Sequence, residues 1–340
     1  MLADCAAAKK TIVLEQFIFT ADEYGTRLIN ICAERAQAGV KVRFLWDAAG
    51  SFTFWGSTIV DDLAHKGIEL KFWRTLIPSY MTVPNLRAWF LRDHRRTLVI
   101  DEKVGYTGSI CVSDRYRDWR DTNVRLIGSV VSEMSNAFER MWGRAAHRRP
   151  LPPRVKVADP DFRYVTNYPA PGRRHISQAL EKALKKARSY VYITTPYFVP
   201  THHLVHLLKK AALRGVEVRI MLPEQTEYYA VDLGARSYFH TLLESGVHIF
   251  LYTGNVIHSK STVIDGTWST VGTLNLDRLS LLYNFEANII SDNPHFAREL
   301  EIHFEKDLTH SKEVTLQEWQ SRFFLEKIPE ILIRAVRKFL

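Results

Sequence analysis

The chain holds two copies of one short pattern: a histidine, a base two residues later, and an aspartate five residues after the base. Histidine acts as a nucleophile or as a general acid and base near neutral pH. A neighbouring lysine or arginine binds phosphate oxygens, as a point charge or as a planar fork. We therefore expect one phosphodiester-handling site built from two halves, with both histidines facing one phosphodiester. The copies consist of His94, Arg96 and Asp101 and, 164 residues later, of His258, Lys260 and Asp265.

Matched polar positions follow both copies. A carboxylate at one of them can hydrogen-bond a histidine Nδ1, which fixes the tautomer and stabilises the cationic ring. We expect Asp121 and Glu286 to orient the two histidines in this way. The other matched pairs are Ser109 with Thr273 and Asn123 with Asn288.

The two copies differ at two positions. Arg96 stands where the second copy has Lys260, which keeps the charge but changes its geometry, because a fork is not a point. Cys111 stands where the second half has Asn275, which removes one phosphate donor. We expect Arg96, Lys260 and Asn275 to hold phosphate oxygens and to stabilise charge in the transition state.

This constellation resembles the phospholipase D superfamily, whose mark is a duplicated His-x-Lys-x4-Asp. Longer strings are similar to bacterial cardiolipin synthases, and the resemblance covers nearly the whole chain. It implies an α/β fold of two pseudo-symmetric phospholipase D-like βα-sandwich halves, each a mostly parallel or mixed sheet flanked by helices. The strings that carry it lie at 117–122, 195–200, 215–223, 275–278 and 284–286.

The resemblance implies phosphatidyl transfer between phospholipids through a phosphohistidine, with His94 as nucleophile and His258 as acid and base. The reverse assignment is chemically possible by pseudo-symmetry. No metal and no other cofactor is expected, because cationic side chains fill that role. Asp101 and Asp265 belong to the motif, but we expect them mainly to tie a strand to its neighbours.

Two other functions use the same residues. A phospholipase D or nuclease-type phosphodiesterase would take water as the acceptor in place of a lipid alcohol. A catalytically impaired module would bind a membrane or another anion without turnover. The expected partners are phosphatidylglycerol or a similar phospholipid and an anionic membrane surface; nucleic acid is not favoured, and the oligomeric state stays open.

Strands and helices alternate in both halves, which predicts largely parallel sheets with βαβ crossovers. We expect His94 and Arg96 to lie on one face of a strand, as His258 and Lys260 do, because residues i and i+2 of a strand point the same way. Strands are expected at 13–19, 40–46, 68–73, 162–167, 190–194, 216–222 and 247–252, and helices at 26–38, 175–187 and 204–214, with Gly39 and Gly215 as helix stops.

The expected domains are a first half at 1–147, a proline-rich linker at 148–158, a second half at 159–310 and an amphipathic helical segment at 311–340. Pro329 is expected to open the last helix. Its apolar side chains (Ile331, Leu332, Ala335, Val336, Phe339) either pack on the body or, with basic residues beside them (Arg334, Arg337, Lys338), lie on an anionic membrane. An apolar insert of about 15 residues before His94 either lines an entry for acyl chains or packs as a flap.

Composition agrees with an anionic partner. The 340 residues include 46% hydrophobic and 24% charged residues and carry a net charge of +9. The scattered Cys5, Cys32 and Cys111 show no disulfide or metal spacing, so a reducing compartment is expected. The first half is short at its N-terminus relative to the second. The resemblance to cardiolipin synthases implies membrane helices upstream, and with it a place at the cytoplasmic side of a bacterial inner membrane, peripheral or anchored by a missing N-terminal segment.

Overall fold

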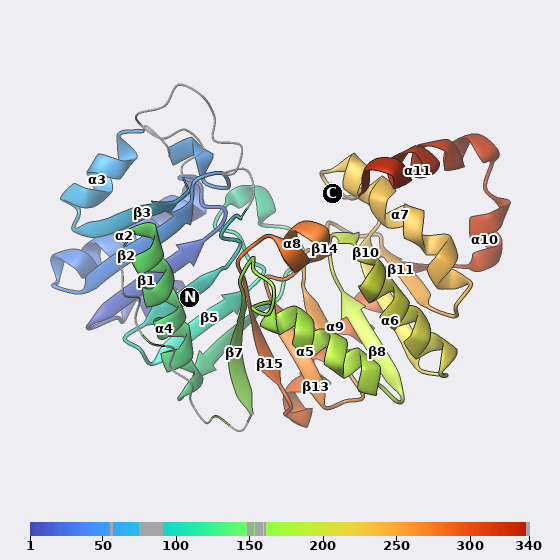
Figure 1. The fold of residues 1–340 in the computed structure, drawn as a ribbon. Coiled ribbons are helices and arrows are strands. Elements are labelled where there is room, and N and C mark those ends of the chain that lie inside the picture. The colour runs from blue at the N-terminus through green and yellow to red at the C-terminus, as the bar shows by residue number, and fades with distance from the viewer. Residues whose placement is uncertain (55–56, 75–90, 148–152, 154–158, 160, 338–340) are drawn as a thin grey trace. The chain divides into compact units, whose positions relative to one another are not determined.

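The computed structural model describes residues 1–340 except 55–56, 75–90, 148–152, 154–158, 160 and 338–340 (Figure 1). Most of the predicted apolar insert and most of the predicted linker lie outside the described residues. By internal contacts the chain forms two units, and each is described separately below. The first comprises Met1–Arg117, Asn123–Thr166 and Asn284–Ile289; the second comprises Asp118–Thr122, Asn167–Tyr283 and Ile290–Leu340.

The first unit is built on a mixed six-stranded sheet in the order β3-β2-β1-β4-β5-β6. Its first three strands are parallel to one another, and the others are antiparallel to their neighbours. The strands are β1 (Thr11–Gln16), β2 (Lys41–Asp47), β3 (Ile68–Trp73), β4 (Thr97–Ile100), β5 (Val104–Gly108) and β6 (Asn123–Ile127).

Helices cover both faces of this sheet. Phe44 of β2 shares a buried cluster with Leu28 of α2, whereas Arg43, one residue earlier, lies over the Phe138 ring of α4. Successive strand residues point to opposite faces, so α2 and α4 lie on opposite sides. The helices are α1 (Leu2–Ala6), α2 (Glu23–Gln37), α3 (Ile59–His65) and α4 (Val130–Ala145), with short 3-10 turns at Phe52–Phe54 and Asp114–Tyr116.

The second unit repeats this plan. Six strands of an eight-stranded sheet belong to it. Their order is β16-β11-β10-β8-β12-β13, in which β10 is parallel to β8 and β11 and the other pairs are antiparallel. These are β8 (Tyr190–Thr194), β10 (Glu217–Pro223), β11 (His248–Tyr252), β12 (Ser261–Ile264), β13 (Trp268–Gly272) and β16 (Ser311–Val314).

The remaining elements of the chain are helices and short or shared strands (Figure 1). The strands β7 (Phe162–Asn167) and β15 (Glu286–Ser291) are neighbours, and β9 (Phe198–Val199) pairs with β14 (Leu276–Asp277). The helices are α5 (His175–Lys186), α6 (His202–Leu213), α7 (Tyr229–Leu243), α8 (Arg278–Leu282), α9 (Pro294–Leu308), α10 (Leu316–Ser321) and α11 (Phe324–Val336).

The repeat predicted from the sequence is confirmed in the order of elements. The series β1-α2-β2-β3-β4-β5 corresponds to β8-α6-β10-β11-β12-β13. Gly39 and Gly215 follow α2 and α6 with φ of 89° and 88°, the left-handed conformation that ends a helix. The strand expected at 13–19 ends at Gln16, because the chain then leaves the sheet and Phe19 pairs with Val112.

The C-terminal segment differs from the prediction of a helical segment at 311–340. Ser311–Val314 forms β16, which continues the sheet by pairing with β11. The last helix begins at Phe324, so Pro329 lies inside it and does not open it. A proline there keeps a helical φ, but it removes its own N–H from the hydrogen-bond ladder and crowds the carbonyl four residues earlier.

Candidate active site

Both motif histidines lie just before a short buried strand. The sequence placed them on the strand itself, but β4 begins at Thr97 and β12 begins at Ser261. Backbone hydrogen bonds hold each histidine in place instead: His94 N donates to Phe285 O at 3.0 Å, and His258 N donates to Arg120 O at 2.8 Å. Both side chains are buried. Fixed main chain therefore sets the position of each ring.

An acid lies against the Nδ1 atom of each histidine, as the sequence predicted. His94 Nδ1 is 3.0 Å from both carboxylate oxygens of Glu286. His258 Nδ1 is 3.1 Å from Oδ2 of Asp121. The pairing is exchanged between the two copies. Glu286 follows the second motif in sequence but contacts the first histidine, and Asp121 follows the first motif but contacts the second histidine. Each contact lies within one unit, since Asn284–Ile289 groups with the first and Asp118–Thr122 with the second.

The hydrogen bonds of His94 define its tautomer. A carboxylate only accepts, so Nδ1 carries the proton and donates it to Glu286. Arg96 Nη2 only donates, and it lies 3.2 Å from Nε2. Nε2 therefore keeps its lone pair, which is the form in which a histidine attacks an electrophile.

Arg96 is a buried cation with spare donors. Arg96 is 3% exposed, and its Nε and Nη1 have no hydrogen-bond partner among the described residues. Leaving buried donors unsatisfied is costly, so this arrangement suits an anion with oxygens beside Nε2 of His94. This is the strongest single indication of a phosphate site.

The second motif offers a different cation. Lys260 is 2% exposed, and its Nζ donates to the carbonyl of His258 at 2.7 Å. Asn275, placed by the chain just before β14, is 3% exposed, and its Oδ1 has no hydrogen-bond partner within the described part of the chain. An amide can turn its NH2 group toward an anion, so Asn275 retains the donor capacity predicted for it.

Each motif aspartate accepts hydrogen bonds from backbone N–H groups at the start of another strand. Asp101 accepts from the backbone N–H groups of Lys9, Lys10 and Thr11, at 2.6–2.9 Å. Asp265 accepts from three equivalent N–H groups ahead of β8, at 2.8–3.0 Å. Both have a φ of 53° and lie at the far ends of β4 and β12 from the histidines. Burial favours a higher pKa for Asp101, but the three backbone donors outweigh it and lower the pKa.

The other predicted supporting residues are buried or half-buried around the strand ends. Ser109 and Thr273 follow β5 and β13 and are fully buried. Asn288 is buried within β15. Asn123 is held by contacts away from His94, since its Oδ1 accepts from Ile110 N and its Nδ2 contacts Met1 Sδ.

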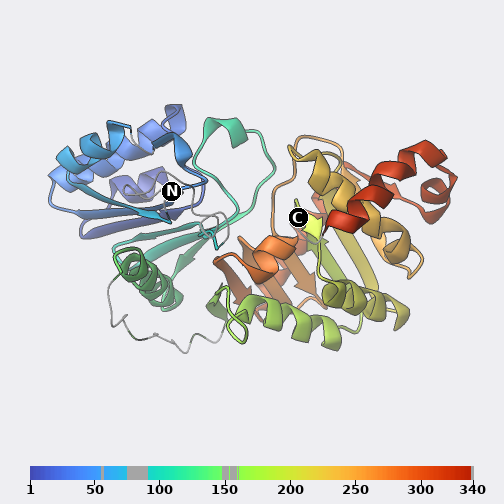
Figure 2. The same ribbon diagram turned by 45° about the horizontal axis from the view of Figure 1, so that its top comes forward.

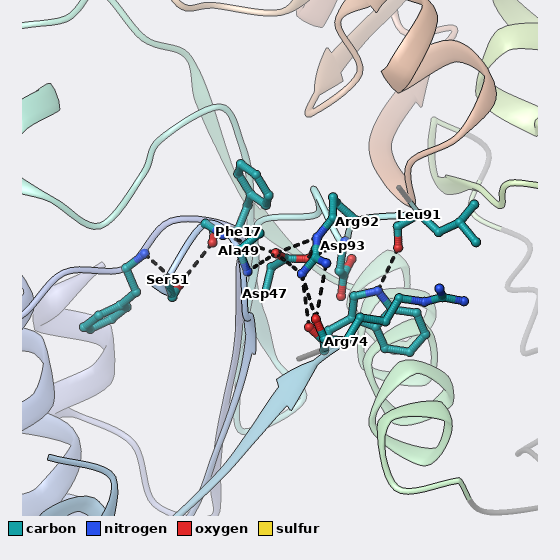
Figure 3. Close-up of polar contacts among 11 residues, drawn as sticks. Phe17, Asp47, Ala49, Ser51, Arg74, Leu91, Arg92 and Asp93 are labelled. Carbon is teal, nitrogen blue, oxygen red and sulfur yellow. Dashed lines mark hydrogen bonds and ion pairs between the residues drawn. The ribbon is translucent and has the colours of Figure 1, made fainter. Parts of the chain in front are cut away.

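A buried network of ion pairs supports the first motif and was not predicted. Arg92 donates to both carboxylate oxygens of Asp47, which also accepts from Asp93 N, and to the carbonyls of Trp73 and Arg74 (Figure 3). Asp47 ends β2 directly after the apolar run 44–46, and this was the available signal. Burial raises the pKa of Asp47, against the opposing effect of Arg92.

Arg95 extends this network on the other side of His94. It donates to Asp93 Oδ1 at 3.0 Å and pairs with Glu15 of β1. Both Arg95 and Glu15 are 1% exposed. Burial raises the pKa of Glu15 well above its usual value, although the charge of Arg95 opposes the shift. Residues 92–96 are thus fixed by charges on both sides of the histidine.

Aromatic rings flank both histidines. Phe17 meets the His94 ring edge to face, with centroids 4.9 Å apart. Trp119 and Tyr197 lie 5.1 and 6.3 Å from the His258 ring, and Tyr197 in turn lies 5.9 Å from Tyr228. Among the described residues, no group of three His, Cys, Asp or Glu is arranged to hold a metal ion.

The structure repeats a mixed sheet twice. Each repeat has a buried histidine and a buried base ahead of a short strand, and an acid on the histidine Nδ1. Together these features define a phospholipase D-like protein. The match to a family model is more specific. The model described as cardiolipin synthase, PLD-like domain, matches residues 1–142 and 180–308, and the chain belongs to this family.

Individual relatives agree with this assignment. The chain is 31% identical over 358 residues to a cardiolipin synthase of Clostridium perfringens, covering 99% of this chain and 73% of the relative. It is 31% identical over 354 residues to the major cardiolipin synthase of Bacillus subtilis, covering 100% and 72%. The crystal structure of a phosphatidylserine synthase from Haemophilus influenzae matches 99% of this chain and 89% of its own, with a TM-score of 0.73 at 17% identity, and so shares the fold.

The comparisons identify a phospholipid-transferring enzyme of the cardiolipin synthase type. None of the described helices is both long enough and apolar enough to cross a bilayer.

Proposed function

We propose that this protein transfers a phosphatidyl group from phosphatidylglycerol, or a similar lipid, to the alcohol of a second phospholipid through a phosphohistidine on His94. The observation that carries the proposal is the Nε2 lone pair of His94 beside the spare N–H donors of Arg96. Cardiolipin synthase relatives at 31% identity support the choice of lipid substrates.

In the first step, His94 Nε2 attacks the phosphorus atom of the donor lipid. A P–N bond forms, the P–O bond to the leaving alcohol breaks, and His258 gives that alcohol a proton. Glu286 stabilises the positive charge on the His94 ring through its Nδ1–H. Arg96, Lys260 and Asn275 bind the phosphoryl oxygens, where negative charge develops.

In the second step, His258 accepts the proton of the incoming lipid hydroxyl. Its oxygen attacks phosphorus, the P–N bond breaks, and His94 regains its lone pair. Two phosphatidylglycerol molecules then yield cardiolipin and glycerol, and all protons are returned. The in-register duplication of the motif supports the use of both histidines in one reaction.

The test is an assay with labelled phosphatidylglycerol in detergent micelles. We expect cardiolipin and glycerol from the wild type, and loss of both products in His94→Ala and His258→Ala. His65→Ala, which changes an exposed histidine on α3, serves as the matched control. Release of phosphatidic acid without cardiolipin would replace transfer by hydrolysis, and cleavage of single-stranded DNA with inert lipid would replace both by a nuclease.

The nucleophile is identified by trapping. Acid-labile label from a phosphate-labelled donor lipid is expected on His94 in His258→Ala, because the intermediate forms slowly but cannot be resolved without the base. Label on His258 in His94→Ala, with none on His94 in the reciprocal variant, would reverse the assignment.

A further inference from the structure

The last helix, α11, presents its apolar side to solvent. Large apolar side chains between 51% and 67% exposed recur along it at helical spacing, and Phe323 precedes them at its N-terminus. Positions three, four, seven and eight residues apart lie on one face of a helix. The stripe consists of Phe323, Phe324, Leu325, Ile331 and Leu332.

The opposite side of α11 is fixed to the body of the second unit. Glu330 is 5% exposed and pairs with Arg322 through both carboxylate oxygens. Arg337 lies 4.2 Å from the Tyr238 ring centroid on α7 and donates to Ser237 Oγ. Both ribbon views show α11 along α7 (Figures 1 and 2). Because polar contacts hold the inner side, the apolar side is left for another surface.

We propose that this stripe of α11 is a contact surface for an anionic phospholipid bilayer. Exposed apolar groups beside cations match an interface of acyl chains and anionic headgroups. Glu330 is neutralised by Arg322. The cations Lys327 and Arg334 therefore have only Glu326 as a remaining acid on α11. The chain as a whole carries a net charge of +9, which complements an anionic surface.

The inner side of α11 adjoins the start of α7, which leads toward the surroundings of His258. Tyr229 lines one cavity together with Glu326, Pro329 and Glu330. Its neighbour Tyr228 is 54% exposed and lies 5.9 Å from the Tyr197 ring, which is 6.3 Å from the ring of His258. Aromatic hydroxyl side chains are suited to the headgroup level of a bilayer. The inference rests on the proposed function in one respect, because the bilayer that the stripe contacts would also contain the lipid substrate.

The test compares vesicle binding by the full chain and two double variants. Leu325→Glu with Leu332→Glu places two acids in the stripe, whereas Leu213→Glu with Ile302→Glu places them on exposed aliphatic side chains of α6 and α9. The wild type and the control are expected to sediment with vesicles of phosphatidylcholine and phosphatidylglycerol in equal parts. The stripe variant is expected to bind at least about tenfold more weakly, because the bilayer can no longer bury the side chains of two exposed leucines. Circular dichroism and thermal melting check that both variants fold.

Three results would overturn the inference: a wild type that does not bind these vesicles, a stripe variant that binds as the wild type does, or binding to pure phosphatidylcholine that is equally strong. A wild-type dimer that the stripe variant converts to a monomer would assign the stripe to a subunit interface instead. Transfer in detergent micelles is measured separately. Binding through the stripe without transfer would refute only the proposed function, and transfer without such binding would refute only this inference.

Discussion

The segment before β4 and the segment before β12 carry the same motif on different supports. Around His94, three flanking residues are charged and form a buried network of ion pairs with Asp47 and Glu15. Around His258, the equivalent positions hold an uncharged set, Val256, Ile257 and Ser259. There Ile257 is fully buried, and Ser259 Oγ lies 2.7 Å from Thr122 Oγ1.

The difference shows that one catalytic geometry can be held by two kinds of interior. In both segments the histidine N makes a backbone hydrogen bond and an acid lies against Nδ1. The first contact fixes the position of the histidine, and the second fixes the orientation of its ring. The surrounding support is free to be ionic or apolar. An ionic support costs desolvation and fails strongly when one partner is lost, whereas an apolar support fails gradually.

The largest expected effect separates the two histidines. Glu286→Gln allows the amide NH2 to donate to Nδ1, which would move the ring proton to Nε2 and remove the attacking lone pair of His94. We expect kcat to fall by about 10³–10⁴. Asp121→Asn should also slow transfer, because the cationic form of His258, which donates the proton, loses the carboxylate that stabilises it. Steady-state transfer assays measure both, with Glu299→Gln on the exposed side of α9 as control.

A phosphodiester with a p-nitrophenol leaving group distinguishes the roles, because this alcohol departs without a proton. It should restore first-step turnover in Asp121→Asn but not in Glu286→Gln. The opposite pattern would mean that His258 is the nucleophile.

The second prediction concerns stability. Arg95→Met leaves Glu15 and Asp93 buried without their cation, and we expect the free energy of unfolding to fall by about 3–5 kcal/mol. Ser259→Ala, at the equivalent position of the second motif, removes the hydroxyl that hydrogen-bonds Thr122 Oγ1 and Arg120 O, and should cost about 1 kcal/mol. Urea denaturation gives both values. Equal losses would show that the two supports do not differ as described.

The third prediction is a pH dependence of the ionic support. Burial raises the pKa of Glu15, so between the unfolded and the folded pKa the folded protein keeps a proton there that the unfolded chain has lost. Above the folded pKa, Glu15 is ionised and pairs with Arg95. Stability from this group is full below the unfolded pKa and declines as pH rises toward the folded pKa. The unfolding free energy of Glu15→Gln relative to wild type should therefore increase from about pH 4.5 upward. Exposed Glu34→Gln should give a flat difference, and a flat difference for Glu15→Gln would contradict the prediction.

The smallest expected effect tests where the two regions are alike. Asp101→Asn and Asp265→Asn each weaken a carboxylate that accepts three backbone N–H groups, and asparagine tolerates a φ of 53°. Each substitution should lower the unfolding free energy by about 1 kcal/mol, and by the same amount in both copies. Thermal denaturation of the pair checks this; a clearly larger effect at one position would break the symmetry of the two strand ends.

Much of the fold follows from the sequence, because strand and helix patterns are local. β3, β7 and β8 have the predicted bounds, and Gly39 and Gly215 end helices as expected. The errors arise where tertiary packing decides. The segment 311–314 reads as the start of a helical region but completes a sheet edge at β11.

The candidate site was predicted in its residues but not in its connections. Matched spacing identified the histidines, the bases and both acids, since chemistry requires those residue types in that order. The buried carboxylates Glu15 and Asp47 were not predicted. Each pairs with an arginine that is distant in the sequence, and local sequence does not identify that partner.

The sequence by itself determined that two histidine motifs repeat in register and that an acid accompanies each. Only the tertiary structure decided that the acids are exchanged, across 192 residues for His94 with Glu286 and 137 for His258 with Asp121. It also decided that α11 turns its apolar side outward, since sequence periodicity defines a face but not its direction. Spacing encodes local geometry, whereas long-range pairing depends on how strands and helices close around a shared interior.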